Sequence, residues 1–352
     1  NCNTCGGSKF TCENTFNRKK LAFRSPQRVA EDLKSIENFI NGPAFIIGDI
    51  LQNGKAYADE ILKEIKNVKF KNHLAFEFFV PPSEEYIIKM KEAVPKYNVE
   101  ISPESHCEEV RKAFGRPFNN EQLERAVASL VKHKCNRIDL FFMTGLPKQT
   151  YKSVMETIDY CDYLLRKYGK DKTLYPFISP LAPFVDPGSE VWEYPEKYGY
   201  KFFARTVEEH RILMENALSW KYFLNYETEW MTRDEIVHST YEAGIRLNEL
   251  KRKYGLISPK IAELVEKRAK TAIKYLEKID AIVQNGQLNS EEWKKISKEI
   301  KDINIHTICY KDELNWPVSF YKFNIFRILA LIGKSAFKKF FGKKSTPVLE
   351  EN

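Results

Sequence analysis

The chain has 352 residues, of which 43% are hydrophobic and 30% are charged, a composition typical of a folded globular protein and unlike that of a disordered chain. Its formal net charge is +8, but seven basic and no acidic residues occupy positions 316–344, which leaves +1 for the rest. A nearly neutral body argues against nucleic acid as a partner. No apolar run approaches the roughly 20 residues that a membrane-spanning helix needs.

The first half of the chain alternates β-rich runs with amphipathic segments of helical periodicity. The predicted strands are residues 44–48, 73–80, 98–102, 136–143 and 174–179. The predicted helices are residues 26–40, 55–66, 83–94, 107–113, 120–133 and 150–168. Strands separated by single helices predict an α/β fold with a parallel sheet or barrel, in which the chemistry lies at the carboxyl ends of the strands.

A Pro- and Gly-rich stretch, residues 180–195, predicts the end of this first domain. The residues that follow are expected to be mostly helical, with breaks near Gly255 and Gly286. We therefore divide the chain into a barrel domain, a helical region and a basic tail. Their boundaries are residues 1–195, 196–315 and 316–352.

The tail contains a segment, residues 320–341, in which Phe, Ile and Leu alternate with Lys and Arg. As a helix it would have a broad apolar side and a basic side, a pattern typical of helices that lie on anionic membranes. The alternative is a terminal helix that docks on the protein itself. We expect a cytoplasmic protein that contacts a membrane through residues 316–344.

Cysteines suggest a metal centre near the start of the chain. The seven cysteines are Cys2, Cys5, Cys12, Cys107, Cys135, Cys161 and Cys309. Their odd number and scattered positions favour a reducing compartment, with most of them buried as small apolar residues. Cys2 and Cys5 are followed by Gly6 and Gly7, and thiolates at this spacing can bind one metal or cluster. A zinc site or a redox pair is the alternative on spacing alone.

Polar residues and glycines gather where the predicted strands end. They are Gly48 and Asp49 after the first strand, Glu77 in the second, Ser102, Glu104 and Ser105 at the third, and Gly145 after the fourth. Gly115 and Arg116 follow the helix after the third strand. With the cysteine loop first, this order resembles the radical S-adenosylmethionine (SAM) superfamily over residues 1–190.

Several segments are also similar to an archaeal-type subgroup of cobalamin-binding radical SAM proteins. They are residues 24–33, 180–189, 199–211 and 224–243. The family motif is CxxxCxxC, and Cys2 and Cys5 match its second and third cysteines. The resemblance therefore implies an N-terminally truncated piece: a partial (β/α)6 TIM-like radical SAM barrel without its first strand, followed by a mostly helical region. A cluster with two of three cysteines should be labile, so we expect this piece to be inactive.

The resemblance also implies the cofactors and their ligands. Cys2 and Cys5 would bind a [4Fe–4S] cluster, whose fourth iron binds SAM, and a cobalamin domain would lie upstream. Gly48 and Asp49 match the strand end that holds the SAM amino group, and Arg116 matches an arginine at the SAM carboxylate. The other residues implied to bind SAM are Glu77, Ser102, Glu104, Ser105 and Gly145. The alternative for Glu77 is an ion pair with a Lys or Arg.

The function that follows is an enzyme that cleaves SAM to a 5′-deoxyadenosyl radical and modifies an unactivated carbon by methylation or C–C bond formation. Its expected partners are a small-molecule or membrane-lipid substrate and an electron donor such as ferredoxin or flavodoxin. One alternative is a radical SAM enzyme that modifies RNA in the manner of a methylthiotransferase. The other is a non-catalytic scaffold that keeps the barrel.

Overall fold

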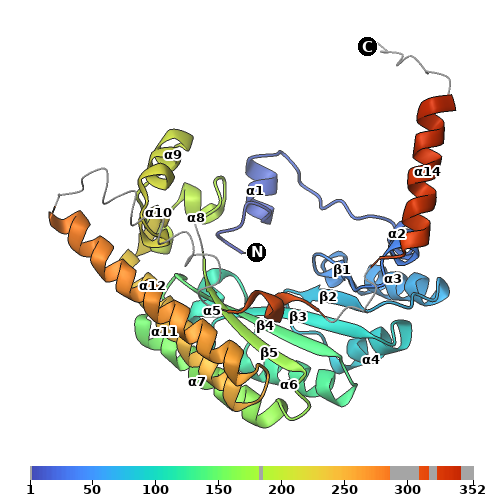
Figure 1. The fold of residues 1–352 in the computed structure, drawn as a ribbon, viewed down its shortest axis with the longest axis horizontal. Coiled ribbons are helices and arrows are strands. Elements are labelled where there is room, and N and C mark those ends of the chain that lie inside the picture. Colours follow the sequence, from blue (N-terminus) through green and yellow to red (C-terminus); the bar gives the residue numbers. More distant parts are fainter. Residues whose placement is uncertain (1, 182–184, 286–308, 317–322, 342–352) are drawn as a thin grey trace.

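The computed structural model describes residues 2–181, 185–285, 309–316 and 323–341. Its centre is a five-stranded sheet in which every strand pairs in parallel with its neighbour in the chain (Figure 1). The strands are β1 (Ala44–Ile46), β2 (Leu74–Phe78), β3 (Tyr97–Glu104), β4 (Arg137–Thr144) and β5 (Leu174–Pro180). The predicted α/β class and all five strands are confirmed.

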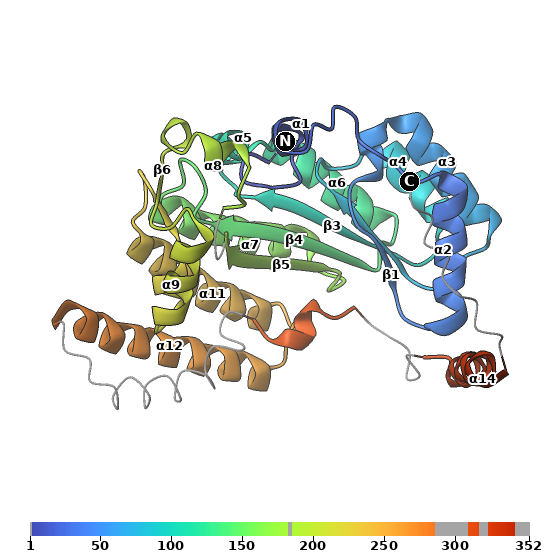
Figure 2. The ribbon, with the colours of Figure 1, turned by 90° about the horizontal axis from the view of Figure 1, so that it is seen from above.

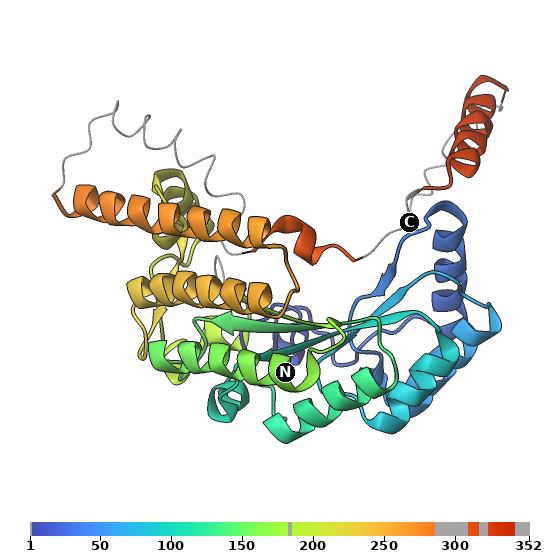
Figure 3. The same ribbon diagram turned by 60° about the horizontal axis from the view of Figure 1, so that its bottom comes forward.

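Helices connect the strands, as expected from the sequence, with two of them, α5 and α6, between β3 and β4. The long ones are α2 (Pro26–Phe39), α3 (Lys55–Asn67), α4 (Glu84–Ala93), α5 (Glu108–Phe114), α6 (Asn120–Lys132) and α7 (Tyr151–Tyr168). Ser25 caps α2 and Asn119 caps α6, because their side chains accept hydrogen bonds from backbone amides of the first turn. Helices α4 and α6 cover one face of the sheet, which we call the outer face (Figure 3).

The two faces of the sheet differ in character because side chains alternate along each strand. Leu74, Phe76 and Phe78 of β2 are buried toward the helices and pack with Ile87 and Met90 of α4 in the main core. The opposite, inner face carries acidic residues instead. Glu77 of β2 pairs in register with Glu100 of β3, and Glu100 pairs with Asp139 of β4.

The region after β5 is mostly helical, as predicted. Its helices are α9 (Val207–Asn216), α10 (Trp220–Phe223), α11 (Arg233–Lys253) and α12 (Pro259–Asn285). Helix α11 packs against α7, β5 and α12, so this region adjoins the β5 side of the sheet (Figure 2).

Further short helical elements lie elsewhere in the chain or just after β5. They are α1 (Lys9–Asn14), η1 (Ile50–Asn53), α8 (Glu190–Glu193) and η2 (Glu196–Tyr198).

Two short strands in this region were not predicted. β6 (Tyr200–Phe202) and β7 (Tyr226–Thr228) pair antiparallel. Each has only three residues, and their pairing joins segments that are separated by α9 and α10. A local pattern of alternation is too short to show such a pair, so its formation depends on tertiary contacts.

A short segment near the C-terminus crosses the inner face of the sheet. It contains η3 (Lys311–Leu314) and Trp316 (Figure 1). Arg137 of β4 donates to the carbonyl oxygens of Glu313 and Asn315, and Lys251 of α11 forms a buried 2.7 Å ion pair with Glu313. The Trp316 indole N–H donates to Asp139 over 3.1 Å. Residues that are distant in sequence are thereby joined across the strands.

Helix α14 (Ile325–Phe341) lies beside α2, away from α11 and α12 (Figures 1 and 3). The backbone amide of Asn324 donates to the Phe39 carbonyl over 2.8 Å, which ties the start of α14 to the end of α2. Its first two turns leave large apolar side chains in solvent. None of the described helices combines the length and apolar character needed to cross a bilayer. Residues 317–322 and 342–352 of the predicted tail lie outside the described ranges.

Replacing Lys251 with Met should destabilise the fold by about 3 kcal/mol, because Glu313 would keep a buried, unpaired carboxylate. Adding Glu313→Gln should restore most of the loss, since both charges are then gone. Urea unfolding followed by circular dichroism measures the difference. If the free energy of unfolding of Lys251→Met is within about 1 kcal/mol of the wild-type value, the pair does not have this stabilising role.

Candidate functional site at the carboxyl edge of the sheet

The cysteine loop is fixed to the carboxyl edge of the sheet by backbone hydrogen bonds. Asn3 N donates to the Phe114 carbonyl at the end of α5 over 3.3 Å, and Val191 N donates to the Asn3 carbonyl over 3.0 Å. Gly6 N donates to the Asp186 carboxylate over 2.7 Å. The loop therefore lies between α5 and the segment that follows β5.

The two thiols of this loop differ in environment. Cys2 is half-buried against Val110, Phe114 and Leu146, whereas Cys5 is exposed. Burial raises the pKa of the Cys2 thiol, and the positive charge of Arg116 opposes that rise. The Gly7 amide points to the Cys5 sulfur at 3.3 Å, a contact that stabilises a metal-bound thiolate. Two thiols held this way fit two ligands of an iron–sulfur cluster.

A third ligand is not found among the described residues. Cys12 directs its sulfur to the Gly7 carbonyl at 4.0 Å and does not join Cys2 and Cys5 around one ion position. The predicted cysteine before Cys2 stays a prediction. In the described ranges, the set of side chains that could share an ion is Asp234, His238 and Asp280, but Lys221 already pairs with both of these aspartates.

The ends of β1 and β2 are joined by carboxylates that accept backbone amides. Gly48 N donates to Glu77 over 2.7 Å. The two oxygens of buried Asp49 accept from Leu51 N at 2.8 Å and Phe79 N at 3.0 Å. Burial raises the pKa of Asp49, and these amides oppose it. Each carboxylate oxygen has a second lone pair, so Asp49 can still accept a hydrogen bond from a ligand ammonium.

Glu104 and Arg116 form a buried ion pair at the end of β3. Their side chains are 4% and 8% exposed, and Nη2 and Nε of Arg116 lie 3.2 and 3.3 Å from one carboxylate oxygen. The guanidinium also stacks on the Phe79 ring at 4.6 Å. Burial raises the pKa of Glu104, while Arg116 lowers it. The other Glu104 oxygen accepts no hydrogen bond from the described residues.

The backbone of Glu104 is in the left-handed region, with φ at +66°. A residue with a side chain pays roughly 1–2 kcal/mol for this conformation. Such strain persists where the surrounding structure holds it, and it is frequent at functional sites. Here it turns the carboxylate toward Arg116, beside a register shift in the pairing of β3 with β4.

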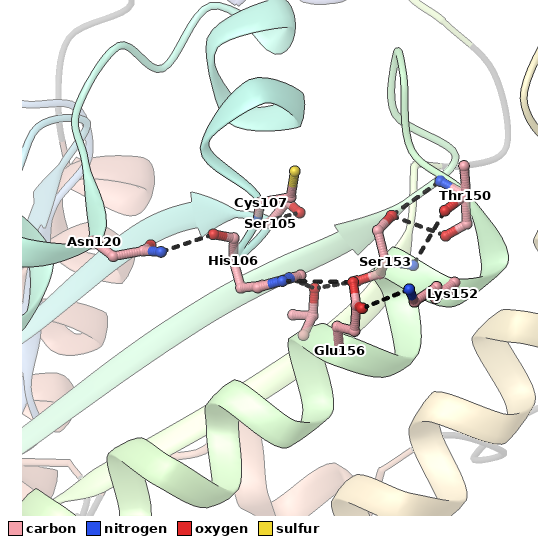
Figure 4. Close-up of polar contacts among 9 residues, drawn as sticks. Ser105, His106, Cys107, Asn120, Thr150, Lys152, Ser153 and Glu156 are labelled. Carbon is pink, nitrogen blue, oxygen red and sulfur yellow. Dashed lines mark hydrogen bonds and ion pairs between the residues drawn. The ribbon is translucent and has the colours of Figure 1, made fainter.

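The two serines at the end of β3 have different surroundings. Ser102 lies partly exposed on the inner face, two residues beyond Glu100. Ser105 is fully buried, and its hydroxyl accepts from the Cys107 amide over 3.2 Å (Figure 4). Next to it, His106 contacts the Thr157 hydroxyl at 3.0 Å. Ser105 thus shapes the turn into α5, and its predicted contact with SAM remains a prediction.

Arg111 supports this turn, and the sequence did not single it out. It is fully buried and donates to the carbonyls of Pro103, Ser105 and Phe118. In the sequence it stands inside an amphipathic helix with other charged residues, so no local signal distinguishes it. Its role is to hold the backbone on which Glu104 is presented.

Gly145, at the end of β4, packs tightly against the β6–β7 pair. Its φ is +88°, and a Cβ there would come within 2.4 Å of the Tyr226 hydroxyl. Tyr200 donates its hydroxyl to the Gly145 carbonyl over 2.8 Å, and Tyr226 donates to the Leu181 carbonyl. The need for glycine therefore has a structural cause, and the predicted contact with SAM is an additional role that stays a prediction.

Comparison with known proteins identifies the class of this domain. Residues 1–161 match the family model of the radical SAM superfamily, so this part of the chain is a radical SAM domain. The predicted radical SAM superfamily is thereby confirmed for this domain, whereas the SAM-cleaving reaction and the [4Fe–4S] cluster are taken up as a proposal below. No curated protein matches the sequence.

Three solved structures are similar to the chain. The radical SAM methyltransferase TsrM from Kitasatospora setae, with cobalamin and a [4Fe–4S] cluster bound, is 14% identical over 69% of this chain and 47% of its own, with a TM-score of 0.44. TsrM with tryptophan and a SAM analogue bound is 16% identical over 53% of this chain and 36% of its own, with a TM-score of 0.41. Coproporphyrinogen III oxidase (HemN) from Escherichia coli is 12% identical over 80% of this chain and 80% of its own, with a TM-score of 0.35. The chain spans less than half the length of TsrM.

Replacing Glu100 with Gln should stabilise the protein in a pH-dependent way. Burial, Asp139 and Glu77 raise the pKa of Glu100 to about 7. When folding raises the pKa of a carboxyl, the free energy of unfolding falls as pH rises from about 4.5 to 7. Above pH 7 the loss stays constant. The free energy of unfolding of the variant should exceed that of the wild type by about 2 kcal/mol at pH 8 and equal it near pH 4.5. Urea unfolding at both pH values checks this, and an equal difference at both would refute it.

Proposed function

We propose that the protein is a cobalamin-dependent radical SAM enzyme that methylates an unactivated carbon of its substrate or forms a C–C bond there. The supporting observation is that the thiols of the cysteine loop and the polar ends of β1, β2 and β3 lie at one edge of the sheet. Arg116 connects them, because its charge acts on Cys2, Asp49 and Glu104 alike. Iron ligands and groups suited to the two charged ends of an amino acid are thus adjacent.

In this proposal, different residues of this edge bind the cluster, the ammonium group of SAM and the carboxylate group of SAM. Cys2 and Cys5 would hold two irons, and the reduced cluster, when bound, supplies the electron that cleaves SAM. Gly48 allows close approach of a ligand, and Asp49 accepts from an ammonium group. Arg116 has five N–H donors, of which Glu104 uses two and the Phe79 carbonyl uses one, so it can also donate to a carboxylate. Ferredoxin or flavodoxin is the electron donor that we propose.

The first test is anaerobic reconstitution of the protein together with any coding sequence upstream of Asn1, followed by an assay for 5′-deoxyadenosine. Cys2→Ala and Cys5→Ala should each lower product formation at least about a hundredfold, because a cluster ligand is lost. Cys12→Ala and Cys107→Ala are matched controls that should keep iron and activity. Full iron loading without product would favour the scaffold, and product only with RNA present would favour the RNA-modifying alternative.

We also propose that α14 holds the enzyme on an anionic membrane, which would give it access to a lipid substrate. Ile325, Leu329 and Ile332 are 56–58% exposed and recur at helical spacing on one face. Arg327 and Lys334, seven residues apart, add positive charge on a second face. An apolar face beside basic residues fits the acyl and phosphate layers of an anionic bilayer.

Vesicle flotation tests this contact. The wild type should float with phosphatidylcholine vesicles that contain phosphatidylglycerol and much less with phosphatidylcholine alone. Leu329→Glu with Ile332→Glu should weaken binding at least about tenfold, since two buried side chains are lost from the bilayer. Val207→Glu, which replaces an 89% exposed residue on α9, is the matched control and should bind normally.

Two results would reject the membrane contact. One is equal flotation of the wild type and the α14 double variant. The other is self-association of the wild type in light scattering, lost in the double variant, without binding to either vesicle. The second result would identify α14 as a contact between copies of the chain.

A further inference from the structure

The inner face of the sheet carries a line of carboxylates from its carboxyl edge to its amino edge. Glu104 ends β3, Glu77 and Glu100 are neighbours in register, and Asp139 faces Glu100 from β4. The four groups are close enough to affect one another, since Glu77 acts on both Glu104 and Glu100, and Asp139 acts on Glu100. This grouping is produced by the parallel register alone.

Positive charge balances only the two ends of this line. Glu104 is paired with Arg116 at 3.2 Å, and Asp139 is paired with Arg137 at 2.7 Å. Among the described residues, neither Glu77 nor Glu100 forms an ion pair, and Glu77 accepts only the amide of Gly48. The middle of the inner face thus has a surplus of negative charge in a partly desolvated position.

A second observation points to a ligand at the same place. Asn98 lies two residues before Glu100 on β3 and therefore on the same face. It is 1% exposed, yet its amide oxygen and nitrogen have no hydrogen-bond partner in the described structure. Leaving both buried groups unpaired costs free energy that a ligand can recover.

The C-terminal segment supplies a floor below these groups. Trp316 packs against Phe45 of β1 at a ring distance of 5.2 Å and donates to Asp139 of β4. Strands β2 and β3 lie between those two contacts; Phe45 is at the register level of Asn98, and Asp139 is at the level of Glu77 and Glu100. The unpaired carboxylates therefore lie two residues nearer the carboxyl edge of the sheet than the row that contains Phe45 and Asn98.

We propose that the inner face binds a cationic nitrogen group of the substrate, an ammonium or guanidinium, between Glu77 and Glu100, with Asn98 as a neutral hydrogen-bonding partner. This inference rests on the proposed function, because it places the substrate on the same face as the SAM-binding edge. A cation there would supply the positive charge that Glu77 and Glu100 lack, between the two ion pairs that involve Arg116 and Arg137. It would also exclude neutral analogues, which leave the two carboxylates unpaired.

The proposal predicts how binding responds to pH. Glu100 is surrounded by Glu77, Asp139 and Arg137, and its raised pKa of about 7 means that it ionises near neutrality. An alkylammonium probe keeps its charge at pH 6 and pH 8, since amines titrate near pH 10. Binding should therefore strengthen about tenfold between these pH values as Glu100 becomes charged.

The test measures binding of n-pentylammonium to the chain by calorimetry, without cluster or SAM, and uses 1-pentanol as the neutral probe. At pH 8, Glu100→Gln should weaken ammonium binding at least about tenfold and leave the alcohol unchanged. Asn98→Leu should weaken the ammonium while raising thermal stability, which a purely structural residue would not do. Glu121→Gln, at a side chain 72% exposed on α6, is the matched control.

The outcomes separate this proposal from the proposed function. Equal ammonium affinity in the wild type and Glu100→Gln, or alcohol binding as strong as ammonium binding, would overturn it whatever the SAM assay shows. Selective weakening of SAM binding by Glu100→Gln would also overturn it, because the carboxylate would then serve the cofactor. Loss of SAM cleavage with ammonium binding intact would reject the proposed function alone.

Discussion

The buried ion pair of Glu104 and Arg116 is the contact on which the candidate site depends. It joins the end of β3 to the loop after α5, and Arg116 also covers Phe79 at the end of β2. Burying both charges is costly unless each is paired, so the pair determines where the strand ends and the loop can lie. The strained backbone of Glu104 and the buried Arg111 below it are part of the same arrangement.

The C-terminal half of the chain completes the site from the other direction. Tyr200 and Tyr226 of the β6–β7 pair close on Gly145, and the cysteine loop is bonded to Asp186 and Val191 after β5. At the opposite edge, Trp316 and Glu313 cover the start of β4. The radical SAM domain is thus enclosed by segments outside residues 1–161.

The inner face combines paired and unpaired carboxylates, and this combination connects fold to chemistry. Parallel register places Glu77, Glu100 and Asp139 side by side, where burial and the two like charges raise the pKa of Glu100. Such a grouping lowers a stability that is small to begin with, and the proposed cation would relieve it. The helices on the outer face supply the apolar burial that offsets it.

The sequence alone was enough to determine the five strands, the six helices α2 to α7 that precede or connect them, and the approach of Gly48, Asp49, Glu104 and Arg116 to one edge. Side-chain periodicity and cap residues are local, and parallel strands bring their carboxyl ends together in any such sheet. Tertiary structure alone decided the β6–β7 pair, the hydrogen bonds of buried Arg111 and the contacts of Trp316 with β1 and β4. It also decided the distinct surroundings of Ser102 and Ser105. These features depend on contacts between distant segments, and no local pattern records which buried charge meets which partner.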